Sequence, residues 1–141
     1  MTSFAIEPEV AGGFGNRTII DTSSGRRKVI KLHYQFDGWL GDALLETTPC
    51  YIVSEPLASD IVGQGLTGYE FDDVVISTSD EFSELYPDVV LPAFRWLKIV
   101  GIPCEDDFGL TPNLSLVVSE RALHVLQSHG ISNAASVIPY P

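Results

Sequence analysis

Cysteine and basic residues are both scarce in this chain of 141 residues. Its two cysteines, Cys50 and Cys104, stand in no CxxC or Cys/His pattern, which excludes a disulfide framework and the usual zinc-site spacings. Both lie among apolar residues, so we expect reduced, mostly buried thiols. Eight Lys and Arg against 19 Asp and Glu give a net charge of −11. Such a balance argues against binding to nucleic acid or to an anionic membrane.

Long apolar runs are also missing. No stretch approaches the about 18 consecutive apolar residues that a transmembrane helix needs, and the first nine residues have neither the basic region nor the apolar block of an export signal. The sequence therefore predicts a cytoplasmic protein. Hydrophobic residues still make up 45% of the chain, which at this length is enough for one folded domain with a core of its own.

Two stretches 65 residues apart are similar without a gap. Val53-Ser54-Glu55 matches Val118-Ser119-Glu120, and Gly65 matches Gly130. In each stretch a β-branched run precedes a Ser suited to cap a helix, apolar residues follow at helical spacing, and a Gly ends the helix. The repeats, near residues 50–76 and 115–139, predict two similar strand–helix–strand units.

The N-terminal third of the chain has weaker patterns. Residues 1–15 contain one Pro and three Gly and predict an irregular lead-in. The runs 16–21 and 28–36 are rich in strand-forming residues with turn residues between them, so they predict a β-hairpin. We interpret His33, on the second of these runs, as a structural or exposed residue rather than a ligand.

Between the repeats, residues 69–78 alternate well enough to predict one strand, and residues 79–88 predict a short acidic helix capped by Ser79. Residues 91–100 predict a strand or an aromatic-rich loop. The predicted fold class is α+β: a single domain over residues 1–141, with a mixed or antiparallel sheet and the two similar strand–helix–strand units.

Candidate catalytic groups are limited to clustered carboxylates, in the pairs and triplet Asp72-Asp73, Asp80-Glu81 and Glu105-Asp106-Asp107. Carboxylates can hold a divalent cation or perform acid–base chemistry. None of the clusters has the alternating acids, central Gly and distal Glu of a calcium loop. The cysteines have no neighbouring signature of a nucleophile either. We therefore predict no catalytic residues, no metal and no cofactor.

The acids are unevenly distributed. Residues 70–107 contain ten acids and two bases, whereas the remainder has nine acids and six bases. Aromatic residues lie between the acids, and charge combined with aromatics is typical of a surface that attracts and holds a basic partner. The predicted partner-binding residues are Asp72, Asp73, Asp80, Glu81, Glu84, Glu105, Asp106, Asp107 and Phe108.

The repeated Val-Ser-Glu, helix and Gly unit, with a Trp-containing segment and Asp106-Asp107-Phe108 between its copies, resembles bacterial immunity proteins of polymorphic toxin systems. The resemblance covers roughly residues 28–139. Some relatives in that family carry paired CxxC motifs, and this chain has none. The resemblance implies a small cytosolic α+β protein that binds one cognate toxin domain and blocks it, with no catalytic residues.

Two other functions fit the sequence. One is a metal-dependent hydrolase that uses the clustered carboxylates. The other is a structural or adaptor domain, for example a homodimer that pairs a free strand edge.

Overall fold

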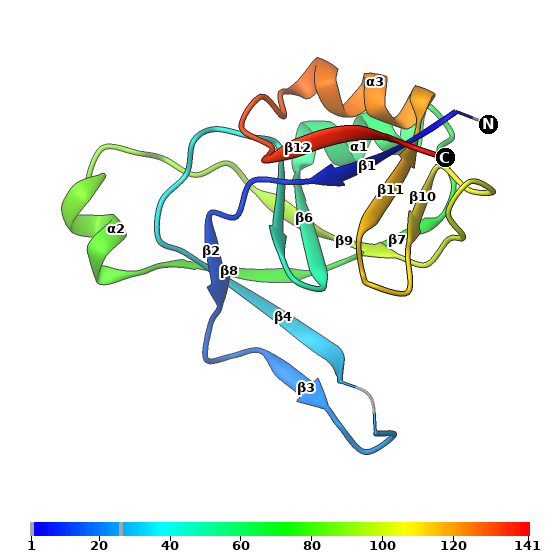
Figure 1. Ribbon diagram of the computed structural model, residues 1–141. Coiled ribbons are helices and arrows are strands. Elements are labelled where there is room, and N and C mark those ends of the chain that lie inside the picture. The colour runs from blue at the N-terminus through cyan, green and yellow to red at the C-terminus, as the bar shows by residue number, and fades with distance from the viewer. Residues whose placement is uncertain (1, 26) are drawn as a thin grey trace.

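The chain folds as α+β in a computed structural model that describes residues 2–25 and 27–141. Its elements, in chain order, are β1 (Ser3–Glu7), β2 (Gly12–Phe14), β3 (Ile19–Asp21), β4 (Lys28–Phe36), β5 (Leu44–Thr47), β6 (Cys50–Ser54), α1 (Glu55–Gly63), β7 (Tyr69–Asp72), β8 (Val74–Thr78), α2 (Asp80–Leu85), β9 (Phe94–Ile99), β10 (Phe108–Leu110), β11 (Leu116–Ser119), α3 (Glu120–His129) and β12 (Ser136–Tyr140). This confirms the predicted fold class. Figure 1 shows α1 and α3 together along one side of the sheets, with the two chain ends close to each other.

Two of the sheets have the same strand order. One runs β5-β6-β9-β7 and the other β10-β11-β1-β12, with every neighbouring pair antiparallel. In each sheet the second strand leads directly into a helix, and the fourth strand is the one that follows that helix. The two sheets differ in the origin of the third strand. In the first sheet it is β9, which comes later in the chain than the other three strands, and in the second sheet it is β1, from the N-terminus.

The match between the two sheets extends to single hydrogen bonds. The Glu55 amide at the start of α1 donates to the carbonyl of Ala93, which precedes β9, over 3.0 Å. The Glu120 amide at the start of α3 donates to the carbonyl of Thr2, which precedes β1, also over 3.0 Å. The two predicted units therefore occupy equivalent places, while their origin as copies of one unit stays a prediction.

The irregular lead-in expected over residues 1–15 is wrong. Strand β1 lies inside a sheet, between β11 and β12, and β2 pairs with β4. At Gly12 an added Cβ would collide with the backbone of Gln35, so this glycine permits close strand pairing rather than disorder. Strand β1 has five residues and β2 only three, so neither is long enough for an apolar alternation to stand out in the sequence.

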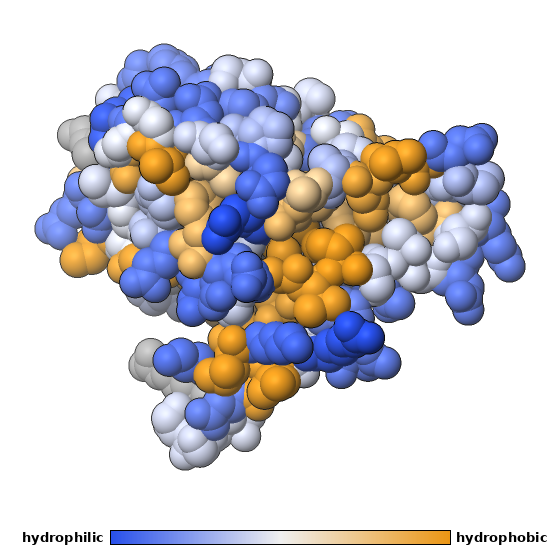
Figure 2. Space-filling view, turned by 180° about the vertical axis from the view of Figure 1, so that it is seen from behind, coloured by the Kyte–Doolittle hydropathy of each residue, from blue (hydrophilic) through white to orange (hydrophobic). Residues whose placement is uncertain are grey.

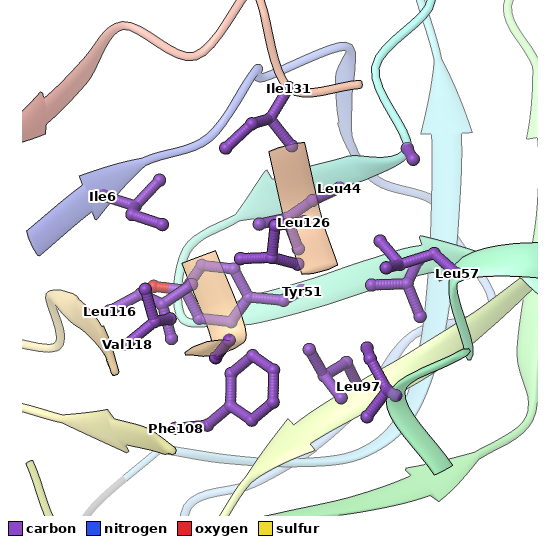
Figure 3. Close-up of a cluster of buried hydrophobic side chains, with 14 of the residues drawn as sticks. Ile6, Leu44, Tyr51, Leu57, Leu97, Phe108, Leu116, Val118, Leu126 and Ile131 are labelled. Atoms are coloured by element: carbon purple, nitrogen blue, oxygen red, sulfur yellow. The ribbon is translucent and has the colours of Figure 1, made fainter. Parts of the chain in front are cut away.

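The main apolar core lies between the two matching sheets and the helices α1 and α3. In Figure 3 Tyr51, Phe108 and Leu126 point toward one another from β6, β10 and α3. All three side chains are almost completely buried, and burial of such a side chain stabilises a fold by about 1.5–3 kcal/mol. The core thus joins the two halves into one unit.

A third sheet lies outside this matched frame. Strand β4 pairs antiparallel with β2 and β3, which confirms the predicted hairpin, and parallel with β8. The single strand expected over residues 69–78 is wrong: β7 pairs with β9 whereas β8 pairs with β4, so the chain changes sheets at Asp73. Figure 1 shows α2 at one end of the molecule and the β3–β4 hairpin projecting from the body.

Candidate partner-docking surface

The predicted acidic residues do not form one surface. Helix α2 carries Asp80, Glu81 and Glu84 at one end of the molecule, whereas the turn between β9 and β10, which contains Glu105 and Asp106, lies at the opposite end (Figure 1). The single docking face inferred from sequence is therefore wrong. It divides into an α2 face, a β7–β8 corner and a β9–β10 turn.

The α2 face is built on a capped helix with one buried anchor. The Ser79 hydroxyl accepts a hydrogen bond from the Phe82 amide over 3.1 Å, as predicted for the cap. Phe82 is buried with its ring edge against Phe36 of β4. With this side chain turned inward, Asp80, Glu81 and Glu84 face solvent. Asp80 and Glu81 lie in the first turn of the helix, where the helix dipole favours negative charge.

Large apolar side chains adjoin these acids. The exposed fraction is 69% for Leu85 and 87% for Val90, and Tyr86 and Val89 between them are also exposed. Residues 79–91, defined here as the α2 segment, contain four acids and no base. An exposed apolar cluster rimmed by charge of one sign has the composition of a protein–protein contact.

The β7–β8 corner carries Asp72 and Asp73, both exposed. The Asp72 carboxylate lies 3.6 Å from the Lys98 ammonium, and the same ammonium lies 4.9 Å from the centre of the Trp96 ring. An exposed ion pair of this kind contributes at most about 1 kcal/mol. The corner is therefore accessible, but Lys98 already offsets part of its charge.

Asp107 and Phe108 were predicted to contact a partner, and the structure buries both. The Asp107 side chain has an exposed fraction of 2% and Phe108 lies in the main core. Neither side chain is accessible to a partner in this fold, so their assignment to the docking surface is corrected to a structural role. Of the remaining two residues of this turn, Glu105 is exposed and Asp106 accepts a hydrogen bond from the Ile102 amide over 2.9 Å.

The Asp107 carboxylate joins segments from both halves of the fold. It accepts hydrogen bonds from the Arg121 guanidinium at 2.7 and 2.9 Å, from the Ser119 hydroxyl, and from the Thr67 amide at 2.9 Å. Burial alone would raise the pKa of Asp107, but the hydrogen bonds from Arg121, Ser119 and Thr67 outweigh it and lower that pKa to about 2. The group is a charged brace at neutral pH.

Asp42 holds the equivalent place in the other half, 65 residues earlier. It precedes β5 as Asp107 precedes β10, and its buried carboxylate accepts hydrogen bonds from the Asn133 amide at 2.9 Å and the Asn133 side chain at 2.8 Å. Each carboxylate thus fixes the turn after the helix of the opposite unit. Extending the repeat alignment back to these two positions is the signal that would have shown Asp107 to be structural.

His33 and Ser77 lie close enough to resemble a catalytic pair, because the imidazole Nε2 and the serine hydroxyl are 2.7 Å apart. The other ring nitrogen, Nδ1, accepts a hydrogen bond from the Arg17 amide over 3.0 Å. In the neutral ring the proton therefore sits on Nε2, which donates to Ser77 and cannot also remove its proton. Burial, with Arg17 and Lys31 nearby, lowers the pKa of His33, so the neutral ring predominates at neutral pH. His33 is structural, as predicted.

The two cysteines differ in their surroundings. Cys50 is buried, and this burial raises the pKa of its thiol to about 12. Cys104 is exposed in the β9–β10 turn, contrary to the expectation that both thiols are buried. Across residues 2–25 and 27–141, no three His, Cys, Asp or Glu side chains gather as a metal site would require.

Comparisons with models of protein families, with curated proteins and with solved structures give no match to this chain. None of the helices that the structure describes has the length and apolar character needed to cross a bilayer.

Proposed function

We propose that this chain is a non-enzymatic immunity protein, which binds a basic cognate toxin domain through the α2 segment and neutralises it. The observation that carries the proposal is the combination, on one short exposed segment, of acidic side chains with the exposed Leu85, Tyr86, Val89 and Val90. Charge of one sign steers a basic partner toward the surface, and the apolar residues provide burial once contact is made.

The position of the α2 segment also supports this function. The matched sheets and their helices form a core-filled frame, and the α2 segment lies outside it on a single buried anchor, Phe82. Segments that project from a rigid scaffold can change in sequence without loss of the fold, which suits recognition of one particular toxin. The resemblance of the Val-Ser-Glu units to immunity proteins is consistent with such a role.

The test uses a toxin C-terminal domain encoded beside the gene for this chain. Glu84→Lys should weaken binding roughly tenfold, mainly through a slower association rate. Cells that express the toxin should survive less well with this variant than with the wild-type chain. Glu105→Lys makes the same charge change at the opposite end of the molecule and should leave binding unchanged. Isothermal titration calorimetry measures the affinity of both variants for the toxin domain, and surface plasmon resonance at two salt concentrations measures their association rates.

Two results would overturn the proposal. One is a toxin domain that forms no complex with the wild-type chain at micromolar concentrations and kills in its presence. The other is an equal loss of affinity in Glu84→Lys and Glu105→Lys, since only the first lies on the proposed contact.

A further inference from the structure

A groove separates the projecting β3–β4 hairpin from the body of the molecule. It consists of two adjoining hollows of about 200 and 230 Å³ that share Arg27, Val29, Pro49 and Leu114 as lining residues. Trp96 of β9 extends the apolar lining of the second hollow. Figure 2 shows apolar residues gathered where the hairpin meets the body, with hydrophilic residues on both sides.

The groove has the opposite charge from the rest of the chain. Its lining contains Arg27, Lys28 and Lys98, and no acidic residue from the described part of the chain. Lys98 is paired with Asp72, but Arg27 and Lys28 form no ion pair with any residue that the structure describes. In the sequence, residues 16–36 hold five bases and one acid, within a chain of net charge −11. An acidic occupant is therefore favoured.

One wall of the groove is an unpaired strand edge. Strands β2 and β3 occupy one edge of β4, while β8 covers the other edge only from Leu32 to Phe36. The second edge is therefore open from Lys28 to Lys31 and can accept an extended segment. Pairing of two such edges from two copies would bring like charges together, so this edge needs an acidic rather than an identical partner.

The α2 segment of the same sequence has the complementary character. It is acidic, it exposes large apolar side chains, and after the helix its residues 88–91 belong to no regular element. It cannot reach the groove of its own chain. Phe82 packs against Phe36 at one end of β4, and Lys28 at the other end lines the groove, roughly 26 Å away at about 3.3 Å per strand residue.

We propose that the groove between the β3–β4 hairpin and the body receives the α2 segment of a second copy of this chain. Each copy offers one groove and one α2 segment, so two copies close a reciprocal, two-fold dimer. The groove is small, and the dimer is accordingly weak and in exchange with monomer. Because the α2 segment is also the proposed toxin contact, the toxin domain displaces the second copy.

The experiment measures the mass of the purified chain alone, by sedimentation equilibrium over a series from micromolar to millimolar concentration. The mass of the wild-type chain should rise from 15.4 kDa toward twice that value. Arg27→Glu, in the groove, and Glu84→Lys, on α2, should each hold the mass near that of the monomer. Arg17 is exposed and lines neither hollow of the groove. Arg17→Glu and Glu105→Lys therefore make the same charge changes outside the contact and should dimerise as the wild type does.

A mixture of the two disrupting variants gives the sharper result. Arg27→Glu and Glu84→Lys should form a 1:1 heterodimer, because one contact then keeps its original charges and the other has both charges reversed. Raising the salt to about 1 M, where the screening length is about 3 Å, should dissociate the wild-type dimer.

Three results would overturn the proposal. They are a wild-type mass that stays at 15.4 kDa through millimolar concentration, a dimer equally sensitive to Arg27→Glu and Arg17→Glu, and a mixture of Arg27→Glu with Glu84→Lys that remains monomeric. The first would assign the groove to an acidic segment of a different protein. No toxin is present in the experiment, so its failure leaves the proposed function to its own test.

Discussion

At the scale of single residues, the surroundings of a carboxylate decide its role. Asp107 accepts five hydrogen bonds from Thr67, Ser119 and Arg121, whereas Glu105, two residues earlier in the same acidic run, is exposed. The first is a brace between the halves of the fold and the second is solvated surface. Their mutants should therefore behave differently.

Asp107→Asn should reduce the free energy of unfolding by about 2 kcal/mol. The substitution removes the charge that the Arg121 guanidinium approaches at 2.7 Å, and hydrogen bonds to charged groups contribute about 1.5–3 kcal/mol each. Urea unfolding followed by tryptophan fluorescence measures the change. Glu105→Gln is the control, with an expected change within about 0.5 kcal/mol. Equal effects of the two substitutions would contradict the structural role of Asp107.

The same brace should give a defined pH dependence. The pKa of Asp107 lies at about 2 in the folded chain, below its ordinary value of 3.8. Because the folded value is the lower one, the stabilising contribution is complete above pH 3.8 and disappears as the pH falls toward 2. The stability difference between wild type and Asp107→Asn should therefore shrink between pH 4 and 2, as measured by urea unfolding at each pH. A difference that is constant over this range would exclude a charged Asp107 as the cause.

At the scale of elements, the two strand–helix junctions look alike in sequence and differ in their caps. The Ser119 hydroxyl accepts a hydrogen bond from the Ala122 amide over 3.1 Å and donates one to Asp107. Ser54, at the matching position, makes no side-chain cap bond, and the helix start there is held by the Glu55 amide on the Ala93 carbonyl. The cap predicted for Ser54 is thus wrong, although the helix begins where expected. The backbone bond does not replace the cap, because the Glu120 amide makes the same kind of bond with the Thr2 carbonyl at the other junction.

Ser119→Ala should destabilise the fold by about 1–2 kcal/mol, the usual effect of losing a helix cap, and Ser54→Ala should have a clearly smaller effect. Thermal unfolding of both variants under the same conditions provides the comparison. If Ser54→Ala proves as harmful as Ser119→Ala, the two junctions are equivalent and the asymmetry described above is incorrect.

At the scale of the whole molecule, the third strand of each matching sheet determines how the halves interlock. Strand β1 fills in one sheet the place that β9 fills in the other, and Ser3 lies opposite Tyr140 in the pairing of β1 with β12. The N-terminal strand therefore completes the half that contains β10, β11, α3 and β12. If the two ends of the chain were joined and the chain were opened between β9 and β10, each half would be continuous in sequence.

A circular permutant that links Pro141 to Thr2 by a short Gly/Ser linker, and opens the chain at Cys104 in the exposed β9–β10 turn, should fold with a stability within about 1 kcal/mol of the wild type. A second permutant, opened between Ser54 and Glu55, should be unfolded, since this junction joins a buried strand to the first turn of α1. Circular dichroism and urea unfolding distinguish the two. Collapse of the first permutant would mean that the β9–β10 connection itself is essential.

The local pattern of the sequence determined several elements by itself. The strand, cap and apolar spacing around Ser119 specify β11 and α3, Ser79 marks the start of α2, and the runs flanking residues 22–27 form the β3–β4 hairpin. Each depends on neighbours within a few residues, where hydrogen-bond caps and side-chain periodicity act. The same information predicted the α+β class.

Only the tertiary structure decided which acidic residues are available to a partner. The brace around Asp107 spans 40 residues to Thr67, and the one around Asp42 spans 91 residues to Asn133. The tertiary structure also placed β1 inside a sheet and separated the α2 segment from the β9–β10 turn. Burial and charge pairing depend on groups that meet only when distant segments pack together, so a run of acids in the sequence does not show which of them remain in solvent.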